Sequence, residues 1–268
     1  MRKRLALFLL TFVIVFTGCG SGRGSERRLK VVASTALIGV AVKAVGGEKV
    51  ALTTITPAEM CPGHFDIQPA AVVAAQDADL LLNHGWEGWW KKLLAGTGSQ
   101  SVRAITLQTR GNWMVPDVHN QAVEEITRIL IELAPGDSGV FRRNSQKYQR
   151  EIDSIASAVR GLFKNRGLPK VICAEPQRDF LVWLGFPVVA VYGRAEEWSA
   201  QELTRLAQVI IDSTVGLIVD NLQSGADAGK PLAEAGKIKQ VTLSGFPLNE
   251  DYPRILLDNC QALIRAME

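Results

Sequence analysis

The stretch at residues 56–69, TPAEMCPGHFDIQP, gathers the side chains best suited to chemistry in this 268-residue chain. It contains His64, one of three histidines, and Cys61 three positions earlier. Imidazole is the commonest metal-binding side chain, and thiolate is a good ligand for zinc or copper. A Cys-x-x-His spacing lets one loop supply two ligands, although Cys61 could also be a small core side chain or form a disulfide with Cys173. We therefore predict a metal site at this loop, with His64 as a ligand.

Two carboxylates follow apolar runs that are typical of buried strands. Asp220 ends the run GLIVD, where it could cap the next turn or supply a hard oxygen ligand. Glu175 follows KVICA, and because an unpaired buried carboxylate is costly, it should meet a cation or a hydrogen-bond donor. Arg178 is the near alternative to a metal ion as that partner. Both carboxylates are candidate ligands.

The roles of the remaining histidines and of a tryptophan cluster depend on the helices and strands around them. His84 ends the apolar run LLLNH, near the crevice expected at the loop that carries His64. It is predicted to support the site or to lie at the surface. His119 is either a ligand or an exposed residue just before a helix at 121–133. Trp86, Trp89 and Trp90 have helical spacing with the leucines after them, which favours core packing over a stacking platform.

The elements that must position these residues alternate between strand and helix. Strands are predicted at 29–33, 50–55, 78–83, 102–107, 170–174, 187–192, 216–220 and 239–243, with helices between them. This alternation predicts an α/β fold with two lobes, each a mostly parallel sheet flanked by helices. A helix of ~40 Å at 137–166 is predicted to connect the N-terminal lobe, 29–136, to the C-terminal lobe, 167–268.

The N-terminus has the pattern of an export signal. A basic start precedes an almost wholly apolar run at 5–16, which predicts a signal peptide at 1–18. The sequence VFTGC resembles a bacterial lipobox, and that resemblance implies lipidation of Cys19; the alternative is an ordinary signal peptide with an incidental cysteine. Residues 19–28 are rich in Gly and Ser and suit a flexible tether.

Composition and motifs exclude several classes of function. Net charge is only +3, and no basic run with interleaved aromatics suggests nucleic acid. Neither HExxH nor a nucleophile elbow is present. A zinc hydrolase using His64, His119 and a carboxylate is therefore a weak alternative, and we predict that the protein is not an enzyme.

Several segments resemble the metal-ion solute-binding lipoproteins of ABC importers, the zinc and manganese group. They include KVVASTALIGVAVKAVGGEKV, PGHFDIQPAAVVAAQDADLLL, EGWWKKLL and LIVDNLQSG, in the family's order. The resemblance implies two α/β lobes joined by a rigid helix, with the metal in the cleft between them. It also implies three histidines and a carboxylate, or two of each, as ligands.

The resemblance assigns four ligand positions. His64 occupies the first, Glu175 the third and Asp220 the fourth. For the second, alignment on Gln121 and Ala122 points to Met114, while His119 lies five residues later. The implied ligand set is therefore His64, His119, Glu175 and Asp220, with Cys61 and Met114 as alternates.

The implied function is capture of a divalent metal ion outside the cytoplasm and delivery to an ABC permease and its ATPase. Zinc is favoured as cargo, with manganese or iron as alternatives. The protein is expected to be a monomer, anchored to the bacterial cell membrane through Cys19 and facing the periplasm or exterior, with no nucleic-acid partner. The same broad scaffold carries siderophores and cobalamin in related groups, so a metal chelate is the alternative cargo.

Overall fold

The computed structural model describes residues 27–98, 102–249 and 251–268. The predicted signal peptide, Cys19 and most of the predicted tether lie outside the described residues. Within the described part, no helix is both long and apolar enough to cross a bilayer.

The described chain alternates strands and helices almost throughout. The N-terminal half contains β1 (Leu29–Ala33), α1 (Ala36–Gly46), η1 (Gly47–Lys49), β2 (Val50–Thr54), η2 (Pro62–His64), α2 (Pro69–Gln76), β3 (Leu80–Asn83), α3 (Trp90–Thr97), β4 (Arg103–Thr106), α4 (Pro116–Leu133) and η3 (Pro135–Asp137). The long helix α5 (Ser138–Phe163) follows. The C-terminal half contains β5 (Lys170–Ala174), η4 (Glu175–Gln177), α6 (Arg178–Leu184), β6 (Val188–Tyr192), η5 (Ala195–Glu197), α7 (Ala200–Ser213), β7 (Val215–Asn221), α8 (Leu222–Gly225), α9 (Lys230–Gly236), β8 (Lys239–Leu243) and α10 (Tyr252–Met267).

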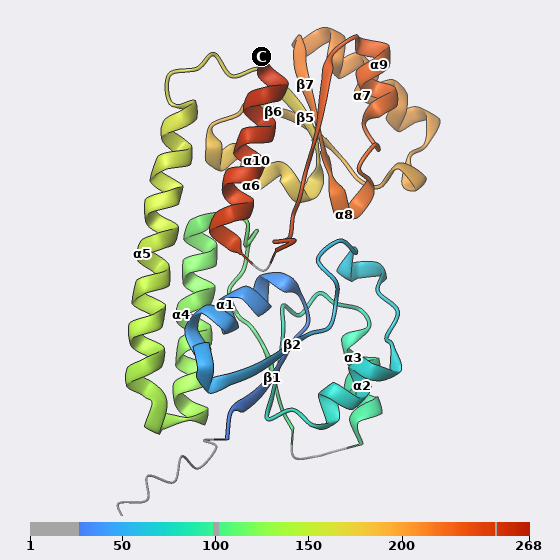
Figure 1. The fold of residues 1–268 in the computed structure, drawn as a ribbon. Helices are drawn as coiled ribbons and strands as arrows, with labels where there is room; N and C mark the ends of the chain where they lie inside the picture. The colour runs from blue at the N-terminus through green and yellow to red at the C-terminus, as the bar shows by residue number, and fades with distance from the viewer. Residues whose placement is uncertain (1–26, 99–101, 250) are drawn as a thin grey trace, which may run out of the picture.

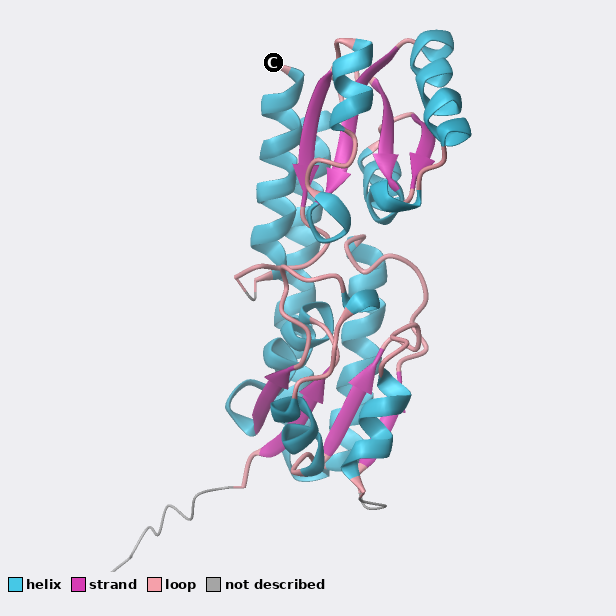
Figure 2. Cartoon of the chain, turned by 90° about the vertical axis from the view of Figure 1, so that its right-hand side faces the viewer, coloured by secondary structure: helices cyan, strands magenta, loops and turns pink. Residues whose placement is uncertain are grey.

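The strands form two parallel four-stranded sheets with the same winding. Their orders are β2-β1-β3-β4 and β6-β5-β7-β8. In Figure 2 the strands of the lower sheet point up and those of the upper sheet point down, so the carboxyl ends of both sheets face the boundary between the lobes. Ligands of open α/β sheets bind at carboxyl ends, where the strand order reverses. Here both reversals, β1/β3 and β5/β7, open toward one boundary.

The central strands are apolar on both faces because helices cover both faces of each sheet. In β3 the side chains of Leu80 and Leu82 join one core cluster, whereas Leu81 joins a second cluster on the opposite face. All three are fully buried. These observations confirm the predicted fold class.

Helix α5 joins the lobes and runs along one side of both (Figure 1). It contacts α1 and α4 in the N-terminal lobe and α6 and α10 in the C-terminal lobe. Its buried face carries Phe141, Ile152, Val159 and Phe163. Twenty-six helical residues span ~39 Å at 1.5 Å per residue, enough to reach from one lobe to the other.

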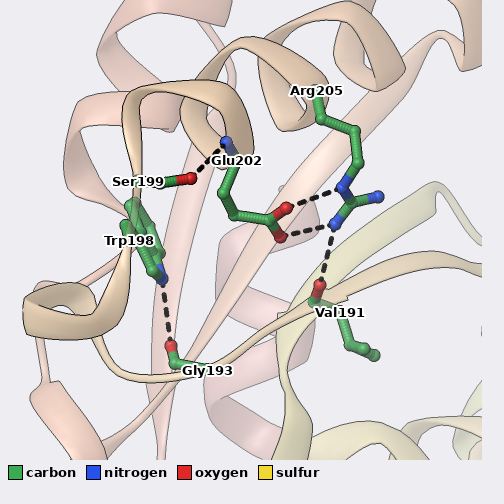
Figure 3. Close-up of polar contacts among 6 residues, drawn as sticks. All are labelled: Val191, Gly193, Trp198, Ser199, Glu202 and Arg205. Carbon is green, nitrogen blue, oxygen red and sulfur yellow. Dashed lines mark hydrogen bonds and ion pairs between the residues drawn. The ribbon is translucent and has the colours of Figure 1, made fainter.

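The connection between β6 and α7 is fixed by side-chain contacts (Figure 3). Ser199 caps α7 by accepting from the Glu202 amide, and the Trp198 indole donates to the Gly193 carbonyl. Arg205 binds the Glu202 carboxylate with Nε and Nη2 at 2.8 and 2.6 Å. This connection contains η5, which lies beside the loop that carries Cys61.

The starts of α4 and α3 bear on the site, and both differ from the predicted residues. Helix α4 begins at Pro116 rather than 121, because proline is well suited to the first helical turn. The spacing of the tryptophans and leucines predicts a helix over 85–94. Helix α3 begins instead at Trp90, because residues 85–89 form a turn in which Gly85 has a φ of 94°. Because α4 begins earlier than predicted, His119 lies inside a helix. Because α3 begins later, Trp86 lies in the turn before it.

Replacing Phe141 with Ala tests the role of α5 as the connecting element. The side chain is fully buried on a helix that packs against α1 and α4, so its loss should destabilise the fold by about 3–5 kcal/mol. The measurement is urea unfolding followed by circular dichroism. Arg142→Ala, on the exposed side of the same helix, is the control and should change stability by less than about 0.5 kcal/mol. Equal effects of the two substitutions would contradict this packing.

Candidate functional site

A cleft of about 460 Å³ lies between the carboxyl ends of the two sheets. Eighteen residues from both lobes line it. Those with polar or aromatic side chains are Cys61, His84, Trp86, Asn112, Trp113, Glu175, Arg178, Asp179, Asn221, Gln223, Ser224 and Phe246. The switch points of both sheets therefore meet in this cleft, which makes it the candidate binding site.

His84 forms the wall of the cleft at the end of β3. It is 6 % exposed, and its Nε2 lies 2.8 Å from Thr35 Oγ1, at the end of the adjacent strand β1. The imidazole stacks on Trp86 with ring centroids 5.2 Å apart and meets the edge of Trp113 at 4.5 Å. Burial lowers the pKa of His84 to about 4, so the ring is neutral at pH 7 and can accept a metal.

Glu87 holds the turn that carries His84. Its carboxylate accepts backbone hydrogen bonds from His84, Gly85 and Trp86 at 3.0, 2.9 and 3.1 Å. The Ser34 hydroxyl donates to the same carboxylate. A single buried carboxylate thus satisfies three loop amides and fixes the direction of the imidazole.

The opposite wall comes from the turn after β5. Glu175, Arg178 and Asp179 lie there within five positions, and all three are exposed toward the cleft. Across the described residues, the structure assigns none of these three side chains a hydrogen bond or an ion pair. The Glu175–Arg178 pair, the alternative to a metal ion, is therefore absent from the described contacts, and these charges are available to a ligand.

Cys61 and His64 lie on the loop that the sequence singles out. The Trp89 indole donates to the Pro62 carbonyl at 2.7 Å, which fastens this loop to the N-terminal lobe. Arg194 of the other lobe lies close enough to Cys61 to interact with it electrostatically, and Glu196 does the same with His64. Cys61 lines the cleft, whereas His64 is exposed beside it. All three described cysteines are free, so Cys61 forms no disulfide with Cys173.

The structure does not bring the four predicted ligands together. Over the described residues, no group of three or more His, Cys, Asp or Glu side chains is arranged to hold a metal ion. Of the predicted set, Glu175 and Cys61 line the cleft and His64 lies at its edge. His119, Asp220 and Met114 are not among the lining residues.

His119 is fully buried where α4, α5 and α10 meet. Its ring stacks on Tyr252 with centroids 3.7 Å apart and an interplanar angle of 8°. Nε2 lies 3.4 Å from the Tyr148 hydroxyl. The residue belongs to the apolar stripe of α4, because it precedes Val123 by four positions and Ile126 by seven. Burial lowers its pKa to about 3.

Asp220 and Met114 also have structural partners. The Asp220 carboxylate accepts from Tyr192, Gln240 and the Gly229 amide beneath the end of β7. Burial raises its pKa. Met114 is 1 % exposed and its carbonyl accepts from the Tyr252 hydroxyl at 3.0 Å.

The sequence predicted other positions for two of the residues that line the cleft. His84 was expected to support the site or lie at the surface, yet it forms part of the wall. Trp86 was expected in the core, yet 53 % of it is exposed, while Trp89 and Trp90 are buried as predicted. The strand order would have identified His84, because β3 adjoins β1 at the switch point.

Comparison with known proteins assigns the family. The model of the ZnuA family, described as "Zinc-uptake complex component A periplasmic", matches residues 31–266. The chain belongs to this family. As the sequence predicts, members of this family are components of uptake systems and not enzymes.

Relatives of this ZnuA family member include substrate-binding lipoproteins of metal ABC transporters. The chain is 26 % identical over 208 residues, 67 % of each chain, to the manganese ABC transporter substrate-binding lipoprotein PsaA of Streptococcus mitis. It is 31 % identical over 207 residues to PsaA of Streptococcus pneumoniae serotype 4, covering 66 % of this chain and 67 % of the relative. The chain spans between 58 and 67 % of the length of four such streptococcal lipoproteins.

Solved structures agree with the fold. The periplasmic zinc-binding protein TroA from Treponema pallidum superposes with a TM-score of 0.75 at 19 % identity, over 90 % of this chain and 99 % of that one. At this identity the likeness establishes the two-lobed fold and its long helix, and the cargo must be argued from the residues of the cleft.

The two buried histidines should make this ZnuA family member sensitive to acid. Both stay neutral in the fold down to about pH 4 and 3, whereas in the unfolded chain they gain protons below the usual value of 6.5. Their contribution to the free energy of unfolding is therefore complete above pH 6.5, and it is lost as the pH falls from there toward 4. The loss is up to about 1.4 kcal/mol per histidine for each pH unit.

Chemical unfolding between pH 7.5 and 4.5 measures this loss. His119→Phe keeps an aromatic ring on Tyr252 and removes one titrating group, so stability should fall with a shallower slope than in the wild type. Identical slopes for the two proteins would show that His119 protonates freely in the fold.

Proposed function

We propose that this protein is the extracytoplasmic receptor of an ABC importer, and that it captures a divalent transition-metal cargo in the inter-lobe cleft and delivers it to a permease and its ATPase. Membership of the ZnuA family supports this role. The observation that carries it is the convergence of both switch points, with unpaired donor groups, on one cleft. Because the walls come from different lobes, binding a cargo couples lobe position to occupancy.

The proposed ligands come from both sides of the cleft. Glu175 is the carboxylate ligand from the C-terminal lobe, and Cys61 and His64 are the ligands from the loop opposite. We add His84, whose neutral imidazole lines the wall. His119, Met114 and Asp220, predicted as ligands, are instead assigned to holding the walls in place, because each is engaged by buried partners.

The donor set favours zinc. Imidazole and thiolate with a carboxylate suit zinc, and a set of histidine and carboxylates alone would admit manganese or iron. Relatives are named for manganese and for iron, and neighbouring structures for zinc and nickel. Identity of the ion therefore depends on whether Cys61 enters the first coordination sphere.

We also propose that the mature chain is held at the membrane by a lipid on Cys19. The relatives named above are lipoproteins, and the export signal and VFTGC sequence support the same placement here. Residues 19–28 would then tether a monomeric receptor to the cell membrane, facing the periplasm or exterior.

The function is tested by adding Zn²⁺, Mn²⁺ or Ni²⁺ to metal-free protein and following its thermal unfolding. A metal that binds the folded state raises the midpoint. Glu175→Gln removes a carboxylate ligand and should weaken binding at least about tenfold, equivalent to about 1.4 kcal/mol. His64→Ala should act in the same direction.

Glu234→Gln is the matched control, because Glu234 is exposed on α9 away from the cleft. It should bind metal like the wild type. If no metal raises the midpoint, and metal content after purification without chelator is the same in all variants, capture of a free ion is refuted.

A further inference from the structure

The cleft is much larger than a bare ion requires. Ligand atoms surround zinc at about 2.0–2.3 Å, so a coordinated ion needs only a small central space. The cleft volume of about 460 Å³ instead falls within the range of small-molecule sites, roughly 300–1,000 Å³. Inter-lobe hydrogen bonds already join the walls, from Asn112 to the Pro176 carbonyl and from Gln223 to the Ala58 carbonyl, each at 2.7 Å.

One wall of the cleft offers an aromatic surface. Trp86 is 53 % exposed, and its ring is held parallel to the His84 imidazole with an interplanar angle of 15°. Trp113 and Phe246 continue the apolar lining. A fixed, exposed indole is a recognition surface for the planar or apolar body of an organic molecule, and a bare ion makes no use of it.

The other wall offers a cation as well as carboxylates. Arg178 lies within three residues of Glu175 and within one of Asp179, with no ion pair to either among the described contacts. A positive side chain beside a metal weakens the binding of the bare ion, and a chelator that carries a carboxylate would bring negative charge to pair with it. A guanidinium is well suited to binding a carboxylate through two parallel hydrogen bonds.

The protein donors are too dispersed in the structure to surround an ion. The described residues contain no group of three metal-binding side chains. His84 is 6 % exposed, its Nε2 is engaged by Thr35, and among the described contacts Nδ1 has no protein partner. This imidazole can supply one coordination position from the wall. A molecule that arrives with the metal must supply the coordination positions that the dispersed protein donors leave open.

We propose that the cargo of this cleft is a divalent metal ion already bound by a small carboxylate-bearing chelator, such as an amino acid. The metal meets His84 and Glu175, the chelator carboxylate pairs with Arg178, and the organic body stacks on Trp86. This inference rests on the proposed function, because it specifies the form in which the metal arrives.

The test is isothermal titration of the full chain with Ni²⁺ alone, with Ni²⁺ premixed with L-histidine, and with L-histidine alone. Free histidine lowers the concentration of free Ni²⁺, so it must strip the metal from a site that binds the bare ion. In a site for the chelate the same addition raises the affinity. We expect binding of the premixed complex at least about tenfold tighter than Ni²⁺ alone, and no binding of L-histidine alone.

Two substitutions separate the chelator contacts from the metal contacts. Arg178→Gln and Trp86→Ala should each reduce the ratio of the affinity for the complex to the affinity for Ni²⁺ alone at least about fivefold. Arg128→Gln, on the exposed side of α4, is the matched control and should keep the full advantage.

The outcomes distinguish this proposal from the function on which it rests. Loss of bound Ni²⁺ on adding histidine, with tight binding of the bare ion, overturns the chelate and leaves the metal receptor standing. Binding of L-histidine without metal also overturns it. Failure of every form of the metal to bind overturns both proposals.

Discussion

The stack between His119 and Tyr252 is the contact on which the geometry of the cleft depends. Tyr252 begins α10 in the C-terminal lobe, and its ring lies 3.7 Å from that of His119 in α4. Its hydroxyl donates to the Met114 carbonyl, one residue after Trp113, whose ring meets His84. A residue of one lobe therefore positions the wall that the other lobe contributes. Neither ring can be hydrated without separating the lobes.

Around this contact, the long helix and the inter-lobe hydrogen bonds restrict how the lobes can move. Helix α5 packs on elements of both lobes, and a continuous α-helix does not act as a hinge. The bonds from Asn112 to Pro176 and from Gln223 to Ala58 cross the boundary at the cleft itself. Cargo exchange must break such local bonds, so we expect modest rocking and loop adjustment rather than wide opening.

Much of this architecture could be predicted from the sequence, because it depends on periodicity. The run from Leu80 to Leu82 predicts a strand covered on both faces, and the spacing of Phe141, Ile152 and Val159 predicts the buried face of the connecting helix. The site was harder to predict, because it depends on where elements begin. Starting α4 at Pro116 moves His119 from a loop into the core stripe, and the turn at Gly85 turns Trp86 outward.

Other features of the site depend on pairings between distant residues, which one sequence does not reveal. Nothing local to Asp220 indicates that Tyr192 and Gln240 will occupy its carboxylate, and the order of β1 and β3 must be known before His84 can be placed in the wall. His64 and Glu175 were identified from their local sequence and from the family resemblance, and the structure places them at or beside the cleft without a shared ion-binding arrangement.

The central claim is that cargo binds between the carboxyl ends of the two sheets. Anomalous diffraction from crystals grown with zinc or with the nickel–histidine complex tests it most directly. We expect one strong anomalous peak in the cleft, within coordinating distance of His84 or Glu175. A peak confined to the protein surface, or coordination by side chains of one lobe alone with the cleft empty, would contradict it.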